Sequence, residues 1–249
     1  MIQDFFGFKK VSPEERTQRV RGVFDSVAAK YDLMNDLMSL GVHRHWKNDL
    51  ISQLPVKTHH KILDVAGGTG DVAFKILEAY PHLNLNVTIC DLTPNMLEVG
   101  RDRAVNKGLI HNIDWICGNA ESLPVPDNTY DIYTISFGLR NVTNLKAALQ
   151  EAFRVLKPGG HFFCLEFSKV QLPLLEKIYA KYSFNILPIL GEYIAKDRES
   201  YQYLVESIQK FPAQEDLSQL LKNTGFYEVH WQNFMAGVSS IHRGTKTTA

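Results

Sequence analysis

The stretch ILDVAGGTGD, residues 62–71, begins with an apolar run and ends with three glycines and an aspartate. A short apolar run that stops at glycines is typical of a buried strand followed by a tight turn. The helical spacing of apolar residues over residues 70–80 indicates that a helix follows the turn. A strand, a glycine turn and a helix in this order predict the start of an α/β fold.

Strand-like runs and helical patterns alternate from this stretch to residue 168. The predicted strands cover residues 60–67, 85–91, 112–118, 130–138 and 161–167. The predicted helices between them cover residues 70–80, 93–108 and 144–160. The alternation predicts a parallel sheet with helices on both faces. Ligands of such sheets bind at the carboxyl ends of the strands, so we expect the site there.

Two helical segments and a pair of strands lie outside this alternation. We expect residues 12–54 to form an N-terminal helical cap and residues 171–223 to form a helical insertion, which together cover the strand ends. Residues 226–244 read as two strands that form an antiparallel pair. With the cofactor-binding core at residues 60–168, we expect a single domain that spans residues 1–249.

The glycine spacing raises two cofactor hypotheses. Gly68, Gly70 and Ala73 satisfy the G-x-G-x-x-G/A spacing of dinucleotide loops. Asp91 follows Gly70 by 91 − 70 = 21 residues, at the end of the second predicted strand, where an acid can bind ribose hydroxyls. NAD enzymes and S-adenosylmethionine enzymes share this pattern, and a plain tight turn is the simplest alternative.

Two carboxylates favour S-adenosyl-L-methionine over a dinucleotide. Asp64 precedes the glycine loop and Asp71 closes it. They would repel a pyrophosphate at the helix N-terminus, whereas they would attract sulfonium and ammonium groups. Asn119 and Ala120 follow the third predicted strand, where they either hold an adenine ring or form a simple turn. We therefore predict S-adenosyl-L-methionine as the cofactor and keep an NAD oxidoreductase as an alternative.

Several stretches resemble one family of enzymes. ILDVAGGTGD, CDLTPNML, GNAESLP and LKPGG are similar to the core of class I methyltransferases. YDLMNDLMSLGVHRHW (31–46) and RVLKPGGHFFCLEFS (154–168) resemble the two signatures of the ubiquinone/menaquinone biosynthesis C-methyltransferases. The resemblance covers nearly the whole chain. It implies a Rossmann-like α/β fold with a mostly parallel seven-stranded sheet and an antiparallel C-terminal strand.

The resemblance also implies a cofactor site and a reaction. The family's cofactor contacts fall on five positions of this sequence, which are Thr69, Asp91, Asn119, Ala120 and Ser136. The glycine spacing adds Gly68 to this predicted cofactor site. The family's reaction is S-adenosylmethionine-dependent methylation of a ring carbon of a prenylated quinol. The substrate is 2-polyprenyl-6-methoxy-1,4-benzoquinol, demethylmenaquinol or both.

Arg140 and Asn141 follow the fourth predicted strand, on the cofactor side of the sheet. Methylation of carbon is helped by a fixed cation that stabilises charge on the quinol oxygen. We predict that Arg140 holds that oxygen or orients a water, that Asn141 bonds to the same group, and that Tyr31 orients a quinol hydroxyl. Alternatively, Arg140 pairs with a carboxylate and Asn141 caps the next helix. His43 or His45 accepts a proton or is structural; no third ligand accompanies them, so we predict no metal.

The bulk composition bears on partners and location. Lys+Arg and Asp+Glu both count 27, so no basic surplus points to nucleic acid. No apolar run approaches the roughly 20 residues that cross a bilayer, and the N-terminus lacks a secretory signal. We expect a cytoplasmic protein whose substrate brings it to the inner face of the membrane. Residues 175–190 either contact that surface, line a tunnel for the prenyl tail or pack as an ordinary helix.

The predicted partners are the prenylated quinol, a quinone-biosynthesis complex and a second copy of the chain. Two other functions stay open. One is methylation of a different small aromatic molecule. The other is a non-catalytic protein that binds the cofactor and scaffolds a complex, although the intact glycine loop and the Arg140–Asn141 pair argue against it.

Overall fold

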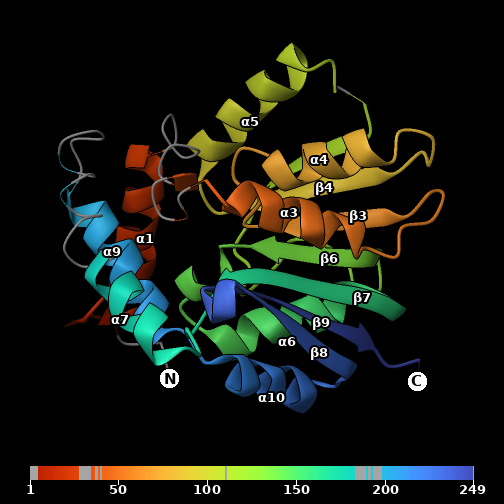
Figure 1. Ribbon diagram of the computed structural model, residues 1–249. Helices are drawn as coiled ribbons and strands as arrows, with labels where there is room; N and C mark the ends of the chain where they lie inside the picture. Colours follow the sequence, from red (N-terminus) through yellow and green to blue (C-terminus); the bar gives the residue numbers. More distant parts are fainter. Residues whose placement is uncertain are drawn as a thin grey trace.

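A seven-stranded sheet runs through the centre of the described structure (Figure 1). The computed structural model describes residues 5–27, 35–36, 39, 41–109, 111–182, 189, 192 and 198–248. The strands lie in the order β5-β4-β3-β6-β7-β9-β8. Their bounds are β3 (Lys61–Val65), β4 (Asn86–Asp91), β5 (Ile113–Cys117), β6 (Tyr130–Ser136), β7 (Leu156–Phe167), β8 (Phe226–Phe234) and β9 (Ser239–Lys246).

The pairing of the strands confirms the predicted fold class. The neighbours from β5 to β7 are parallel, and β9 is antiparallel to both β7 and β8. The predicted helix over residues 144–160 is too long, because Leu156 already pairs with Tyr130 and begins β7. The register then shifts, so that His161 pairs with Ile132. The LKPGG stretch is therefore the irregular first part of a strand.

Helices cover both faces of the sheet, as predicted. α3 (His43–Ser52), α4 (Asp71–Ala79) and α5 (Pro94–Asn106) pack on one face (Figure 1). α6 (Leu145–Val155) and α10 (Gln214–Thr224) pack on the other. Each face has its own cluster of buried apolar side chains, because successive residues of a strand point to opposite faces.

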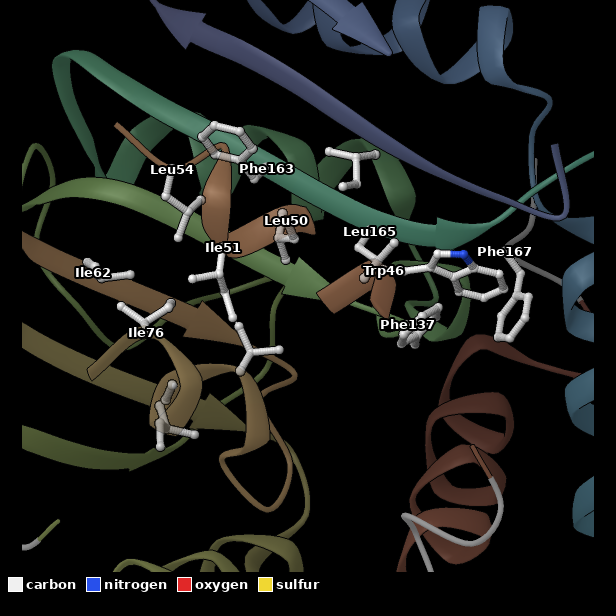
Figure 2. Close-up of a cluster of buried hydrophobic side chains, with 14 of the residues drawn as sticks. Trp46, Leu50, Ile51, Leu54, Ile62, Ile76, Phe137, Phe163, Leu165 and Phe167 are labelled. Carbon is white, nitrogen blue, oxygen red and sulfur yellow. The ribbon is translucent and has the colours of Figure 1, made fainter. Parts of the chain in front are cut away.

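Figure 2 shows the apolar cluster on the α3 face. Trp46 and Leu50 lie four residues apart on α3, so they share the stripe that faces the sheet. Ile62 of β3 belongs to this cluster, whereas the next residue, Leu63, belongs to the cluster on the other face. α3 is therefore part of the core of the sheet.

The carboxyl ends of the parallel strands are covered by a different group of helices. α1 (Pro13–Val27), α7 (Pro173–Lys181) and α9 (Arg198–Lys210) gather at the left in Figure 1. α9 contacts the short helix η2 (Leu139–Asn141), which follows β6. The predicted cap over residues 12–54 is thus divided, because α1 lies at the strand ends whereas the apolar stripe of α3 packs on a sheet face.

The predicted insertion over residues 171–223 is divided in the same way. α7 and α9 lie at the strand ends, whereas α10 packs against β8. A short hairpin of β1 (Phe5–Phe6) and β2 (Lys9–Lys10) precedes α1. Beyond Tyr182, the segment 175–190, for which a membrane contact, a tunnel or an ordinary helix was predicted, lies mostly outside the described residues.

Replacement of Leu50 by alanine tests the assignment of α3 to the core. The Leu50 side chain is 0% exposed, so Leu50→Ala is expected to lower the free energy of unfolding by about 2–5 kcal/mol. The matched control is Val105→Ala, because Val105 is 64% exposed and its loss should change stability by less than about 0.5 kcal/mol. Urea denaturation followed by circular dichroism measures both, and equal values for the two variants would contradict the assignment.

Candidate active site

The glycine loop after β3 is packed so tightly that a side chain does not fit in it. A Cβ at Gly67 would lie 2.8 Å from Ile89 Cγ2 and 2.9 Å from Asp64 Oδ2. Gly68 and Gly70 have φ angles of 55° and 83°, which glycine adopts without a steric penalty. The backbone of the loop can therefore lie directly against a bound molecule.

A cavity of about 720 Å³, partly open to solvent, lies beside this loop. Its walls come from the loop, from the residues that follow β4, β5 and β6, and from one side of α1. It lies at the carboxyl ends of the strands, where the topology of the sheet places ligands. Five of the predicted site residues line it: Gly68, Asp91, Asn119, Ala120 and Asn141.

Asp91 connects the wall of the cavity to the glycine loop. Its Oδ2 accepts a hydrogen bond of 2.9 Å from the Gly68 N–H, and its Oδ1 accepts one of 2.9 Å from the Thr93 N–H. Burial raises the pKa of the carboxyl, and these two N–H groups oppose the rise. Each carboxylate oxygen keeps a further lone pair, so Asp91 can accept hydrogen bonds from ribose hydroxyls.

Asn119 shapes the next part of the wall. Its Oδ1 accepts a hydrogen bond of 3.0 Å from the Glu121 N–H. Glu121 in turn accepts one of 2.7 Å from the Thr143 N–H, which joins this turn to the segment after η2. The Asn119 amide nitrogen has no hydrogen-bond partner in the part of the chain that the structure describes, so it is the group that can bind an adenine ring.

Two predicted cofactor residues, Thr69 and Ser136, line a second, smaller cavity beside the loop. This cavity has a volume of about 290 Å³, and Ala66 lines both cavities. Asp64 is buried in its wall, where one oxygen accepts a hydrogen bond of 2.7 Å from the Thr134 hydroxyl. The other Asp64 oxygen and the Ser136 hydroxyl are buried without a hydrogen-bond partner among the described residues.

The two carboxylates of the glycine loop differ in their electrostatic surroundings. Burial raises the pKa of Asp64 to about 7. Burial acts in the same direction on Asp71, but the Lys47 ammonium, 2.7 Å from its Oδ2, holds the pKa of Asp71 below its usual value. Asp64 is therefore the loop carboxylate that has no ion-pair partner in the described structure.

Arg140 is paired with a carboxylate and buried. Its Nη1 donates hydrogen bonds of 2.6 Å to Glu166 Oε1 and 2.6 Å to the Phe137 carbonyl. Glu166 also accepts from the backbone N–H groups of Arg140 and Phe167. Burial raises the pKa of the Glu166 carboxyl, and the Arg140 guanidinium opposes that rise. Arg140 does not line either cavity beside the loop, so the geometry corresponds to the alternative in which it pins the segment after β6.

Asn141 lines the larger cavity and is held by two hydrogen bonds. Its Nδ2 donates to the Phe137 carbonyl at 3.3 Å, and its Oδ1 accepts from the Tyr203 hydroxyl at 3.1 Å. Burial raises the pKa of Tyr203 to about 12, which keeps this hydroxyl protonated as a donor. Asn141 does not cap α6, because the side chain at that cap is Asn144.

Arg16 of α1 is a buried residue that supports the wall of the larger cavity and that sequence reasoning missed. It donates hydrogen bonds to the carbonyl oxygens of Val142 and Arg140. The hydroxyls of Thr17 and Thr143 lie 3.0 Å apart beside it. An arginine in a helix with a polar face reads as a surface residue, so no local pattern could have identified it.

The other predicted candidates are Tyr31, His43 and His45. Tyr31 lies outside the described residues. His43 is buried on α3 with its Nε2 3.0 Å from Asp36 Oδ1, and burial lowers its pKa. Neither His43 nor His45 lines the two cavities beside the loop. The described residues contain no group of three or more side chains that could hold a metal ion.

Comparisons with known sequences give consistent results. Residues 11–246 match the ubiE/COQ5 methyltransferase family. The ubiquinone/menaquinone biosynthesis C-methyltransferase UbiE of Brucella abortus is 51% identical, over 98% of this chain and 91% of its own length. The mitochondrial 2-methoxy-6-polyprenyl-1,4-benzoquinol methylase of Dictyostelium discoideum is 46% identical, over 98% of this chain and 86% of its own.

Two solved methyltransferase structures share the fold of this chain. A SAM-dependent methyltransferase from Thermotoga maritima has a TM-score of 0.65 at 18% identity, over 92% of this chain and 100% of its own. Phosphoethanolamine N-methyltransferase 2 of Haemonchus contortus, in complex with S-adenosyl-L-methionine, has a TM-score of 0.58 at 17% identity, over 82% of this chain and 52% of its own. At these identities the likeness concerns the fold.

The Arg140–Glu166 pair generates a stability prediction. Arg140→Ala leaves a buried carboxylate without its partner, so it is expected to lower the free energy of unfolding by about 3–5 kcal/mol. The control is the double variant Arg140→Ala/Glu166→Gln, which removes the unpaired charge and should recover part of the loss. Urea denaturation measures both. Unfolding like that of the unmodified protein, combined with loss of activity, would instead favour direct contact between Arg140 and the substrate.

Proposed function

The chain belongs to the ubiE/COQ5 methyltransferase family, and on this premise we propose that it methylates a ring carbon of a prenylated quinol with S-adenosylmethionine as the methyl donor. The substrate is a 2-polyprenyl-6-methoxy-1,4-benzoquinol, demethylmenaquinol or both. The observation that carries the proposal is the 51% identity to a ubiquinone/menaquinone biosynthesis C-methyltransferase over 98% of the chain.

The residues around the glycine loop fit S-adenosylmethionine, which supplies an electrophilic methyl group on a sulfonium. Gly67 and Gly68 leave room for close approach of the ligand to the backbone. Asp91 is positioned for ribose hydroxyls, and Asn119 with Ala120 for the adenine. The unpaired Asp64 carboxylate attracts the positive groups of the cofactor. A dinucleotide fits less well, because its pyrophosphate would lie near the same carboxylate.

The rest of the larger cavity suits an apolar ring. Val20 and Phe24 of α1 and Phe137 after β6 contribute apolar wall, and Asn141 is a polar group among them. In the proposed reaction Asn141 hydrogen-bonds a quinol oxygen, and its amide is oriented by Tyr203. Arg140 acts from behind the wall by holding η2, so it positions Asn141 without touching the ring.

Methyl transfer to reduced quinols tests the proposed function. The protein is incubated with labelled S-adenosylmethionine and either reduced quinol, and mass spectrometry locates the added methyl group. We expect it on a ring carbon of at least one quinol. If neither quinol is methylated and an unrelated phenol is, the protein is a methyltransferase for another aromatic molecule. Cofactor binding without transfer to any acceptor would favour the scaffold alternative.

Cofactor binding is expected to depend on pH through Asp64. Its pKa of about 7 means that the carboxyl is mostly neutral at pH 6 and mostly ionised at pH 8. A positively charged ligand favours the ionised form, so affinity should increase with pH, by up to about tenfold over this range. Calorimetric titration with S-adenosylmethionine measures the effect, with Asp64→Asn as the control variant. An unchanged pH dependence in that variant would assign the effect to other groups.

A peripheral contact with the inner face of the membrane follows from the proposed substrate. None of the described helices is long and apolar enough to span a bilayer. Leu172 and Leu174, at the start of α7, are 56% and 74% exposed, and Lys177 and Lys181 are exposed on the same helix. Exposed leucines next to lysines suit an anionic membrane surface. Tyr179, in contrast, packs against the core, as in the ordinary-helix alternative for this segment.

Membrane binding is tested by co-sedimentation with anionic vesicles. Leu174→Glu is expected to reduce the bound fraction several-fold, because it places a carboxylate on an apolar anchor. Val105→Glu is the matched control, since Val105 is an apolar residue that is 64% exposed on α5. Equal binding by the two variants would contradict a role for α7.

The proposed protein partners are a second copy of the chain and a quinone-biosynthesis complex. β8 is an edge strand of the sheet and exposes Tyr227 and Trp231. Edge strands have unpaired backbone groups that a second chain can bind, which supports the homodimer. Analytical ultracentrifugation of the purified chain distinguishes a monomer from a dimer.

A further inference from the structure

Lys47 is a buried cation that the proposed reaction does not use. Its side chain is 4% exposed, and lysine is almost never fully buried unless it is paired. The ammonium donates one hydrogen bond, of 2.7 Å, to Asp71 Oδ2 and has no other hydrogen-bond partner in the described part of the chain. An ammonium carries three donors, so two of them are available to a ligand.

The smaller cavity combines this cation with unpaired acceptors. Lys47, Asp64 and Ser136 all line it. Asp64 Oδ2 and Ser136 Oγ are buried without partners among the described residues, and such groups cost free energy unless something bonds to them. A ligand that bears both a negative and a positive group can satisfy both sides of the cavity.

We infer that Lys47 binds the carboxylate of the cofactor's amino-acid end, with Asp64 facing the ammonium group of the same end. The inference rests on the proposed use of S-adenosylmethionine and adds a residue to its site. Ala66 lines both cavities, so a cofactor whose adenosine occupies the larger cavity can extend its amino-acid end into the smaller one. The N-terminus of α4, which begins at Asp71, adds partial positive charge there.

The packing of α3 explains how its lysine reaches the carboxyl edge of the sheet. Trp46, the neighbour of Lys47, lies 5.9 Å from Phe167 and 6.4 Å from Phe137, measured between ring centroids. Figure 2 shows these three rings together at one end of the apolar cluster. The Lys47 ammonium lies 6.0 Å from the centroid of the Phe137 ring. The indole therefore fixes the first turns of α3 beside the site.

The alternative is that Lys47 only neutralises Asp71 and joins α3 to α4. Two ligands separate the hypotheses: S-adenosylmethionine, and its decarboxylated analogue, which keeps the sulfonium and the ammonium but lacks the carboxylate. Two variants isolate the cation. Asp71→Asn removes the carboxylate and keeps the Lys47 cation, and Lys47→Gln/Asp71→Asn removes both charges, so that the two variants differ only in the cation.

Calorimetric titration of the full chain with each ligand gives the dissociation constants of both variants. The titration needs no quinol, so its result does not depend on which ring the protein methylates. We expect the double variant to bind S-adenosylmethionine at least tenfold more weakly than Asp71→Asn does. For the decarboxylated analogue, the dissociation constants of the two variants should agree within about twofold. Equal weakening of both ligands, or no weakening of either, would overturn the assignment. Circular dichroism verifies that both variants are folded. If the double variant is not, Lys47→Gln replaces it and is compared with the unmodified protein, with the same expected difference between the two ligands.

Discussion

The buried ion pair between Arg140 and Glu166 is the interaction on which the site depends. Arg140 follows β6 and Glu166 lies near the end of the neighbouring strand β7, so the pair joins two parallel strands at their carboxyl ends. Phe137, which lies between the end of β6 and η2, has a φ angle of 57°, which a residue with a side chain rarely adopts. Hydrogen bonds from Arg140 and Asn141 to the Phe137 carbonyl stabilise this conformation.

The segment after β6 then organises the two helices that cover the strand ends. Tyr203 of α9 donates to Asn141, and Arg16 of α1 donates to carbonyl oxygens of the segment. The cavity wall is thus built outward from one short, rigid turn. The hydrogen bonds of this network hold the segment in place, although Nε of Arg16 and Nε of Arg140 are buried without partners among the described residues.

The fold and half of the site follow from patterns that extend over a few residues. The glycine loop, with Gly68, and the acid Asp91 belong to a strand–turn–helix–strand unit, whose glycines and alternating apolar residues are visible locally. The division of the site into two cavities is not visible in this way. Thr69 and Ser136 line the smaller cavity, whereas Asp91 lines the larger one, and no spacing rule predicts which cavity a residue lines.

The residues that sequence reasoning missed act over long separations. Glu166 lies 26 residues from Arg140, and Tyr203 lies 62 residues from Asn141. Lys47 and Arg16 are basic residues on helices, where solvent exposure is the ordinary expectation. Only the packing of these helices against the strand ends makes them buried, and that packing depends on tertiary contacts that a linear pattern does not contain.

The way in which α1 is attached has a consequence for the evolution of the pocket. Arg16 bonds to main-chain oxygens of Arg140 and Val142, which every amino acid supplies. Val142 is, however, also one of the residues that line the larger cavity. Substitutions at this position can therefore reshape the space for a substrate while the anchorage of the helix is inherited unchanged, so that ring preference and architecture can diverge independently.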